Sequence, residues 1–159
     1  MRILGIDPGP TESGVCLIET GKPINEQVIK VEKAFNIDIV NALRYRQFGV
    51  IGQIAIEDMV YQARGFGKES IETTKFIGFL QCELSHLYIP YELYSRREYG
   101  RWFVTDGTLN DASLRAALES TYGPSAKKGD PLYALRGASD KRSAFALAKY
   151  HEFKLRQKV

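Results

Sequence analysis

The chain has 159 residues, of which 44% are hydrophobic, and 22 Lys and Arg against 19 Asp and Glu give it a net charge of +3. This length is typical of one domain, which can bury roughly two-thirds of its unfolded surface. The mild positive charge does not by itself indicate a protein that binds nucleic acid. The first residues, MRILGIDPG, reach an acid and a Pro-Gly turn too early for a signal peptide, and no apolar run is long enough to span a bilayer.

Few residues are available for a disulfide or a zinc site. Cys16 and Cys82 are the only cysteines, and each lies in an apolar stretch, so we expect two buried, reduced thiols. His86 and His151 are the only histidines, which argues against structural zinc. The composition therefore favours an intracellular, soluble protein with no membrane contact and no small-molecule cofactor.

The N-terminal part of the chain predicts three strands. Residues 3–7 are followed by Pro-Gly-Pro and residues 14–19 by Gly-Lys-Pro, so these two strands should pair as a hairpin. Residues 27–32 alternate apolar and charged side chains, which is typical of a strand with one wet face. We expect this third strand to complete an antiparallel meander.

The rest of the chain alternates between helices and short strands. Apolar spacing and turn residues predict a helix over 37–48, a buried strand over 53–57, a helix over 69–87 and a strand over 91–94. A helix over 108–122, a surface loop over 125–137 and a last helix from Ala138 should follow. The helix over 69–87 carries Thr73, Ile77, Leu80 and Leu84 on one face, and the helix over 108–122 is capped by Thr108 or Asn110 and stopped by Gly123-Pro124. Residues 1–159 should therefore form a single α/β domain with a mixed five-stranded sheet, three antiparallel strands followed by parallel strands, flanked by helices.

Two acids stand at the ends of predicted strands. In this order of elements the first and fourth strands can be parallel neighbours, which would place Asp7 and Glu57 side by side at one edge of the sheet. Two such carboxylates repel each other unless a cation lies between them, and hard oxygen ligands suit Mg²⁺ or Mn²⁺. Taken singly, Asp7 is a common turn residue and Glu57 a solvated strand end.

A third acid lies near the start of the last predicted helix. Asp140 shares a helix face with Ala144, Leu147 and Ala148, at spacings of four, seven and eight residues. This apolar face should pack on the sheet. Asp140 is therefore either a cap-like residue beside free backbone amides or a metal ligand directed at the sheet, and the spacing leaves both open.

The motifs GIDPG and AIE, together with an Asp before an alanine-rich helix, resemble RuvC-type Holliday junction resolvases of the RNase H-like superfamily. The segments GKESIETTKFIG, NDASLRAALESTYG and KKGDPLYALRGASD are similar to the phage-encoded branch, and the resemblance spans nearly the whole chain. It implies that Asp7, Glu57 and Asp140 are catalytic residues that bind one or two Mg²⁺ or Mn²⁺ ions. Bacterial members have another Asp three residues after the position of Asp140, where this chain has Ser143.

The resemblance implies a crossover junction endodeoxyribonuclease of DNA recombination and repair, in the cytoplasm of a bacterial or virus-infected cell. Water would attack the phosphodiester in line and leave 5′-phosphate and 3′-hydroxyl ends. A four-way junction has two-fold symmetry, so paired symmetric nicks call for a homodimer, with the helix over 69–87 and its Phe76 and Phe79 as the interface.

Three other interpretations are weighed against this one. Another RNase H-like nuclease would act on branched or flap DNA or on RNA-DNA hybrids. A non-catalytic junction-binding protein is favoured by Ser143. A sugar-kinase or actin-like ATPase also opens with a strand and Asp-x-Gly, but it needs two such domains, for which 159 residues are too few.

Cationic and aromatic side chains in several segments suit contacts with DNA, where charge binds phosphate and rings stack on unpaired bases. The simpler interpretation is that the cations are solvated and the rings cover the core. The predicted DNA-binding residues are Tyr61, Arg64, Phe66, Lys68, Arg96, Arg97, Lys127, Lys128, Lys141 and Arg142.

Overall fold

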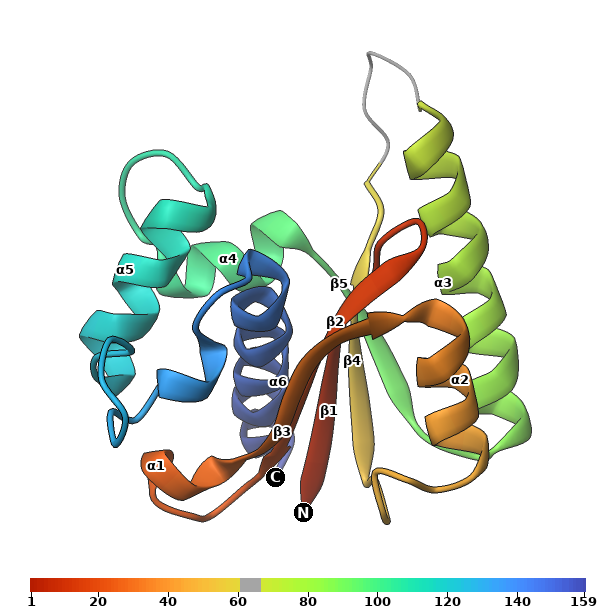
Figure 1. Cartoon of the computed structure of the whole chain (residues 1–159), viewed down its shortest axis with the longest axis horizontal. Coiled ribbons are helices and arrows are strands. Elements are labelled where there is room, and N and C mark those ends of the chain that lie inside the picture. The colour runs from red at the N-terminus through yellow and green to blue at the C-terminus, as the bar shows by residue number, and fades with distance from the viewer. Residues whose placement is uncertain (61–66) are drawn as a thin grey trace.

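The computed structural model describes residues 1–60 and 67–159, which form a five-stranded sheet with helices on both faces (Figure 1). The strands are β1 (Arg2–Asp7), β2 (Glu12–Glu19), β3 (Val28–Phe35), β4 (Gln53–Asp58) and β5 (Tyr91–Ser95). The helices are α1 (Ile24–Gln27), α2 (Asn36–Arg44), α3 (Lys68–His86), α4 (Arg96–Phe103), α5 (Asp111–Tyr122), the short 3₁₀ helix η1 (Tyr133–Leu135) and α6 (Ser139–Gln157).

The strand order is β3-β2-β1-β4-β5, with β1 at the centre of the sheet. The first three strands pair antiparallel, whereas β4 runs parallel to both β1 and β5. The mixed sheet predicted from the sequence is therefore confirmed. Ile6 lies opposite Ile56 in the parallel ladder, so the residues that follow them, Asp7 and Glu57, lie at the same end of the sheet, where β1 and β4 terminate.

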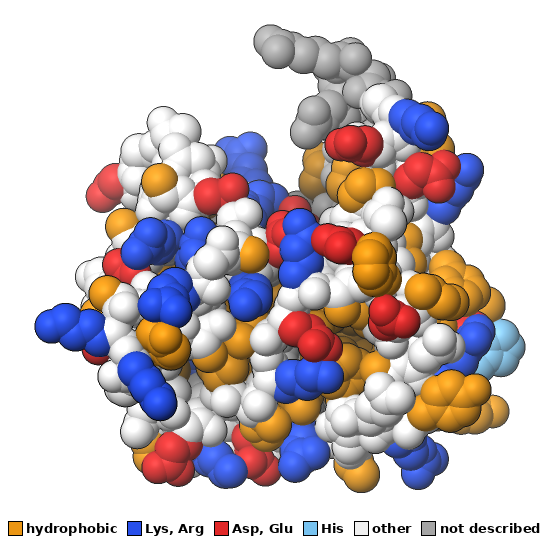
Figure 2. Space-filling model, in the orientation of Figure 1, with side chains coloured by type: hydrophobic (Ala, Val, Ile, Leu, Met, Phe, Trp, Pro, Cys, Tyr) orange, Lys and Arg blue, Asp and Glu red, His pale blue; other side chains and the backbone are white. Residues whose placement is uncertain are grey.

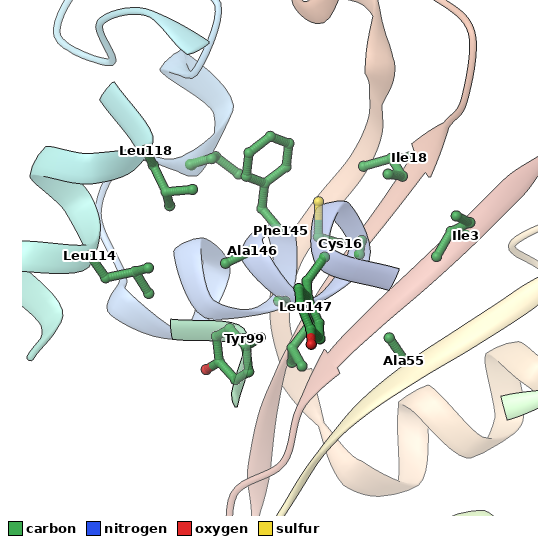
Figure 3. Close-up of a cluster of buried hydrophobic side chains, with 14 of the residues drawn as sticks. Ile3, Cys16, Ile18, Ala55, Tyr99, Leu114, Leu118, Phe145, Ala146 and Leu147 are labelled. Atoms are coloured by element: carbon green, nitrogen blue, oxygen red, sulfur yellow. The ribbon is translucent and has the colours of Figure 1, made fainter. Parts of the chain in front are cut away.

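Alternate residues of the central strands enter two separate cores, as expected for a sheet that is buried on both faces. Helices α2 and α3 cover one face, and α4, α5 and α6 cover the other (Figure 1). On β1, Leu4 and Ile6 join the first core, while Ile3 joins the second. The second core is built around α6, whose Phe145 and Leu147 lie between the sheet and α5 (Figure 3).

Helix α6 approaches the sheet unusually closely because β1 and β2 present glycines to it. A Cβ atom added at Gly5 would overlap the backbone carbonyl of Ala144, and one added at Gly14 would overlap the backbone and Cβ of Asp140. Glycine is required at such positions because any side chain would push the two backbones apart. The first turns of α6 are thereby held directly against β1 and β2.

Several element boundaries differ from those predicted. Helix α2 ends at Arg44 instead of residue 48, because Arg46 adopts a left-handed conformation (φ 53°) that no helix continues. The third strand runs over Val28–Phe35 instead of 27–32, since the unpredicted helix α1 takes up Gln27. Of the two predicted caps, Asn110 is the one that caps α5.

Three further expectations are wrong in part. Helix α4 falls in a segment for which no helix was predicted. The loop over 125–137 contains η1, and its Leu132 and Leu135 are buried instead of lying at the surface. Cys16 is buried as predicted, but Cys82 is exposed, because it lies on the outer side of α3 between the inward-facing Leu80 and Leu84. None of the helices that the structure describes is both long and apolar enough to cross a bilayer.

We predict that Gly5→Ala will destabilise the fold by about 2 kcal/mol or more, since the new methyl group must displace the backbone of α6. Urea unfolding followed by circular dichroism measures this change. Gly78→Ala is the control, because Gly78 lies within α3 and nothing lies within 4 Å of its added Cβ. Equal stability of the two variants would contradict the close contact at Gly5.

Candidate active site

Three carboxylates from distant parts of the chain lie at one end of the sheet. Asp7 is the last residue of β1, and Glu57 follows the residue of β4 that pairs with Ile6. Asp140, the second residue of α6, lies against Gly14, which is the partner of Asp7 in β2. The structure thus brings together the three acids that the sequence singles out, while their roles remain a prediction.

The pKa values of these acids reflect burial and mutual repulsion. Burial, followed by the negative charges of Glu57 and Asp140, raises the pKa of Asp7 to about 8, against the opposing charge of Arg96. Burial also raises the pKa of Glu57, although a hydrogen bond from Tyr99 and the charge of Arg96 lower it. The site therefore concentrates more negative charge than its own cations neutralise.

Arg96 and Tyr99 of α4 fix the Glu57 side of the site. The hydroxyl of Tyr99 donates to Oε2 of Glu57 at 2.5 Å, and burial raises the pKa of Tyr99, so the hydroxyl stays protonated. Arg96 donates to the Tyr99 hydroxyl at 2.9 Å, to Oγ of Ser143 at 2.5 Å and to Oδ1 of Asp111 at 2.7 Å. The Arg96 guanidinium also lies 4.0 Å from Oε2 of Glu57, which makes it a fixed cation inside the site.

Lys33 of β3 compensates the charge on the other side of the site. Its Nζ lies 2.9 Å from Oδ2 of Asp140 and 3.9 Å from the more exposed Glu12. Asp140 raises the pKa of Lys33, mainly through this hydrogen bond. Asp140 is therefore held between the sheet and a lysine, at the side of the site opposite Arg96.

The turn after Asp7 is held by a small hydrogen-bond network. The backbone N–H of Gly9 donates to Oγ of Ser13 at 3.1 Å, and this hydroxyl donates to Oδ1 of Asn36 at 2.6 Å. The side-chain amide of Asn36 returns a hydrogen bond to the carbonyl of Gly9 at 3.0 Å. The Asp-Pro-Gly turn is thus tied to β2 and α2, which limits how far the backbone at Asp7 can shift.

The donor set fits a divalent cation in chemical type. Asp7, Glu57 and Asp140 offer hard carboxylate oxygens, and the burial of Asp7 beside two like charges is the arrangement that a bound cation relieves. Within residues 1–60 and 67–159, no three His, Cys, Asp or Glu side chains are gathered as a ready set of ligands. Instead, Asp140 pairs with Lys33 and Glu57 with Tyr99.

Sequence reasoning assigned Arg96 to DNA contacts and missed Tyr99, Asp111 and Lys33 entirely. One signal for α4 was available: Ser95-Arg96-Arg97-Glu98 matches the Ser-x-x-Glu pattern of a helix start, and Ser95 indeed accepts a hydrogen bond from the Glu98 N–H. A helix starting there places Arg96 and Tyr99 three residues apart, on one face. No pattern in the sequence indicated Lys33, because its role depends on the packing of α6 over β2 and β3.

The predicted DNA-binding residues are spread around the site. Tyr61, Arg64 and Phe66 lie outside the described residues. Lys68 and Arg97 are exposed near the starts of α3 and α4.

The remaining predicted cations lie on the side of the molecule formed by α5 and α6, where Lys and Arg side chains gather (Figure 2). Lys127 and Lys128 follow the end of α5 that is farthest from Asp111, about 18 Å along the 12-residue helix, so the structure does not bring them to the carboxylates. Lys141 and Arg142 are half-buried beside Asp140. The charge of Arg142 contributes to lowering the pKa of Glu119 on α5.

Comparison with known proteins identifies the fold. No family model and no curated protein matches the sequence. Among solved structures, the chain superposes on Thermus thermophilus RuvC bound to a Holliday junction substrate with a TM-score of 0.74 and 16% identity, covering 99% of this chain and 96% of that one. A second Thermus thermophilus RuvC structure gives 0.69 at 16% identity, covering 99% and 97%.

The yeast mitochondrial Holliday junction resolvase Ydc2 gives a TM-score of 0.57 at 14% identity, covering 99% of this chain and 84% of that one. The class of fold is therefore RNase H-like, as the sheet order and its flanking helices also indicate. More narrowly, the chain has the fold of RuvC along nearly its whole length. The fold expected from the sequence resemblance is thereby confirmed.

The raised pKa of Asp7 makes the stability of the metal-free protein depend on pH. The pKa of the Asp7 carboxyl is 3.8 in the unfolded chain and about 8 in the folded protein. The folded state is therefore favoured at low pH, and this stabilisation is lost progressively as the pH rises from 3.8 to about 8. We predict that in EDTA the melting temperature of the wild type falls between pH 6 and pH 9 relative to Asp7→Asn. Added Mg²⁺ should restore the wild type and leave the variant unchanged.

Thermal melts of both proteins at the two pH values, with and without Mg²⁺, measure this difference. Asp106→Asn is the control, because Asp106 is an exposed acid outside the site. Parallel curves for wild type and Asp7→Asn would contradict the burial of a repelled carboxylate at Asp7.

Proposed function

We propose that the chain is a metal-dependent endonuclease that cleaves four-way DNA junctions by paired symmetric nicks. The observation that carries this proposal is the convergence of Asp7, Glu57 and Asp140 at one end of a sheet with the RuvC fold. One of the similar structures, Ydc2, is described as a Holliday junction resolvase, and another is RuvC bound to a Holliday junction substrate. We assign this function to the chain from its site and not from its fold, since one fold can host many activities.

The three carboxylates would hold Mg²⁺ or Mn²⁺, which when bound activates water and stabilises charge on the phosphate. The other residues of the site would keep these carboxylates in place. Tyr99 orients Glu57 by donating to one of its oxygens, so the second oxygen is left for the cation. Arg96 offers positive charge near the site of reaction, where negative charge develops on the phosphate.

Branched DNA would reach the carboxylates from the side on which α3 and α4 begin. Figure 2 shows the surface hollowed at this end of the sheet, with acidic and basic side chains adjacent. Lys68 and Arg97 are exposed there and would bind backbone phosphates, which positions DNA without reading its sequence. Lys141, beside Asp140, would do the same.

We predict that the purified protein will nick a synthetic four-way junction symmetrically with Mg²⁺ or Mn²⁺, and that Asp7→Asn will bind the junction with nearly wild-type affinity but lower cleavage at least ~100-fold. The substitution removes a metal ligand with little change in volume. Cleavage is measured on end-labelled junctions, and binding by gel shift in Ca²⁺ or EDTA. Flap DNA, linear duplex and an RNA-DNA hybrid of the same sequence are the comparison substrates.

Junction bound but left uncut by the wild type would replace this proposal by a non-catalytic junction-binding protein. Preferred cleavage of the flap or of the hybrid would instead assign the chain to another RNase H-like activity.

A homodimer is part of this proposal, because a two-fold symmetric junction is cut twice by two equivalent sites. The predicted interface on α3 needs one correction: Phe76 is buried in the core and cannot supply contacts, whereas Phe79 is 42% exposed and Ile71 47% exposed. An apolar groove beside α3 is lined by Ile71, Thr74, Gly78 and, at the end of β4, Asp58. The outer side of α3 therefore remains our proposed interface.

We predict that the protein sediments as a dimer at micromolar concentration and that Phe79→Glu shifts it to the monomer, because a charge in an apolar interface is poorly solvated. Tyr45→Glu is the matched control, since Tyr45 is 75% exposed and lies at the end of α2. A monomeric wild type, with and without junction DNA, would remove the dimer from the proposal.

A further inference from the structure

We infer that Arg96 takes the place of a second metal ion, so that each active site binds one divalent cation and not two. This inference rests on the proposed function and specifies the metal content of its site. It is drawn from the position of the Arg96 guanidinium, which lies among the carboxylates on the side of Glu57. A two-metal site instead needs a second cation at about 4 Å from the first, held by further anionic oxygens.

The guanidinium of Arg96 is held in place from several directions. It donates hydrogen bonds to Tyr99, Ser143 and Asp111, which belong to three different helices. The side chain is only 29% exposed, and its charge lies 4.0 Å from Oε2 of Glu57. An arginine with this many partners does not leave the site without breaking three hydrogen bonds, so its positive charge is a permanent part of the site.

The described groups on the Glu57 side of the site are already engaged by Arg96 or Tyr99. The further acid whose charge acts on Glu57 from this side is Asp111, and its Oδ1 is already paired with Arg96 at 2.7 Å. Ser143 is buried one helical turn after Asp140, so it faces the same region as Asp140, but its hydroxyl is neutral and already accepts a hydrogen bond from Arg96. Oε2 of Glu57 already accepts the Tyr99 hydroxyl. A second divalent ion here would meet a guanidinium where it needs a carboxylate, and like charges at this range repel strongly.

Mn²⁺ binding to the full chain tests the inference. Calorimetric titration should give one tight ion per wild-type chain and none for Asp7→Asn. Electron paramagnetic resonance should show the spectrum of an isolated ion, because two Mn²⁺ ions about 4 Å apart would be exchange-coupled. Two tight ions, or a coupled spectrum, in the wild type would overturn the inference.

Two changes should create the second site. The double variant Ser143→Asp with Arg96→Gln supplies a carboxylate and removes the fixed charge, so we expect two tight Mn²⁺ ions and a coupled spectrum. Ser143→Asp with Arg96→Lys retains a positive charge and should still bind one. A double variant that is folded by circular dichroism but binds one ion would show that Arg96 is not what excludes the second.

Arg97→Gln combined with Ser143→Asp is the matched control for lost charge, because Arg97 neighbours Arg96 on α4 but is exposed. It should bind one ion. Junction cleavage by the same wild-type preparation separates this inference from the proposed function. Cleavage with two bound ions would leave the function standing and overturn the inference, while one bound ion without cleavage would support the inference and overturn the function.

Discussion

The contact between α6 and the centre of the sheet is the constraint on which the rest of the structure depends. Gly5 and Gly14 allow the helix backbone to lie directly on β1 and β2, and the apolar side chains of α6 hold it there. Burial of residues such as Phe145 and Leu147 contributes about 1.5–3 kcal/mol each. This hydrophobic energy opposes the repulsion that results when Asp140 is placed beside Asp7.

The charge distribution of the site follows from the position of Asp140 beside Asp7. Carboxylates packed together by the core need positive charge, and two elements at the margins of the site provide part of it. Arg96 enters from α4 on the Glu57 side, and Lys33 enters from β3 on the Asp140 side. Neither cation contacts Asp7 directly among the ion pairs of the described residues, and Asp7 is the acid whose pKa is raised to about 8. The negative charge that these two cations do not compensate is therefore centred on Asp7, at the end of β1.

The sheet and its three acids could be predicted from the sequence because they depend on local patterns. Strand periodicity and turn residues located Asp7 and Glu57, and helical spacing placed Asp140 on the face of α6 that meets the sheet. The compensating residues were harder to find. Tyr99 lies on a helix whose start pattern at Ser95 was overlooked, and Lys33 resembles any solvated lysine of an alternating strand. Their roles come from contacts between elements distant in the chain, which periodicity does not encode.

The wide separation of Asp7 and Asp140 along the chain also affects how the protein matures. β1 and α6 are far apart in the sequence, so this contact closes one of the longest loops in the fold and carries a correspondingly large cost in chain entropy. During synthesis, the strands that carry Asp7 and Glu57 emerge well before the helix that carries Asp140. Until α6 docks, the three carboxylates cannot meet. Assembly of the site therefore depends on the docking of α6, and a chain in which this helix is not yet docked lacks one of the three acids.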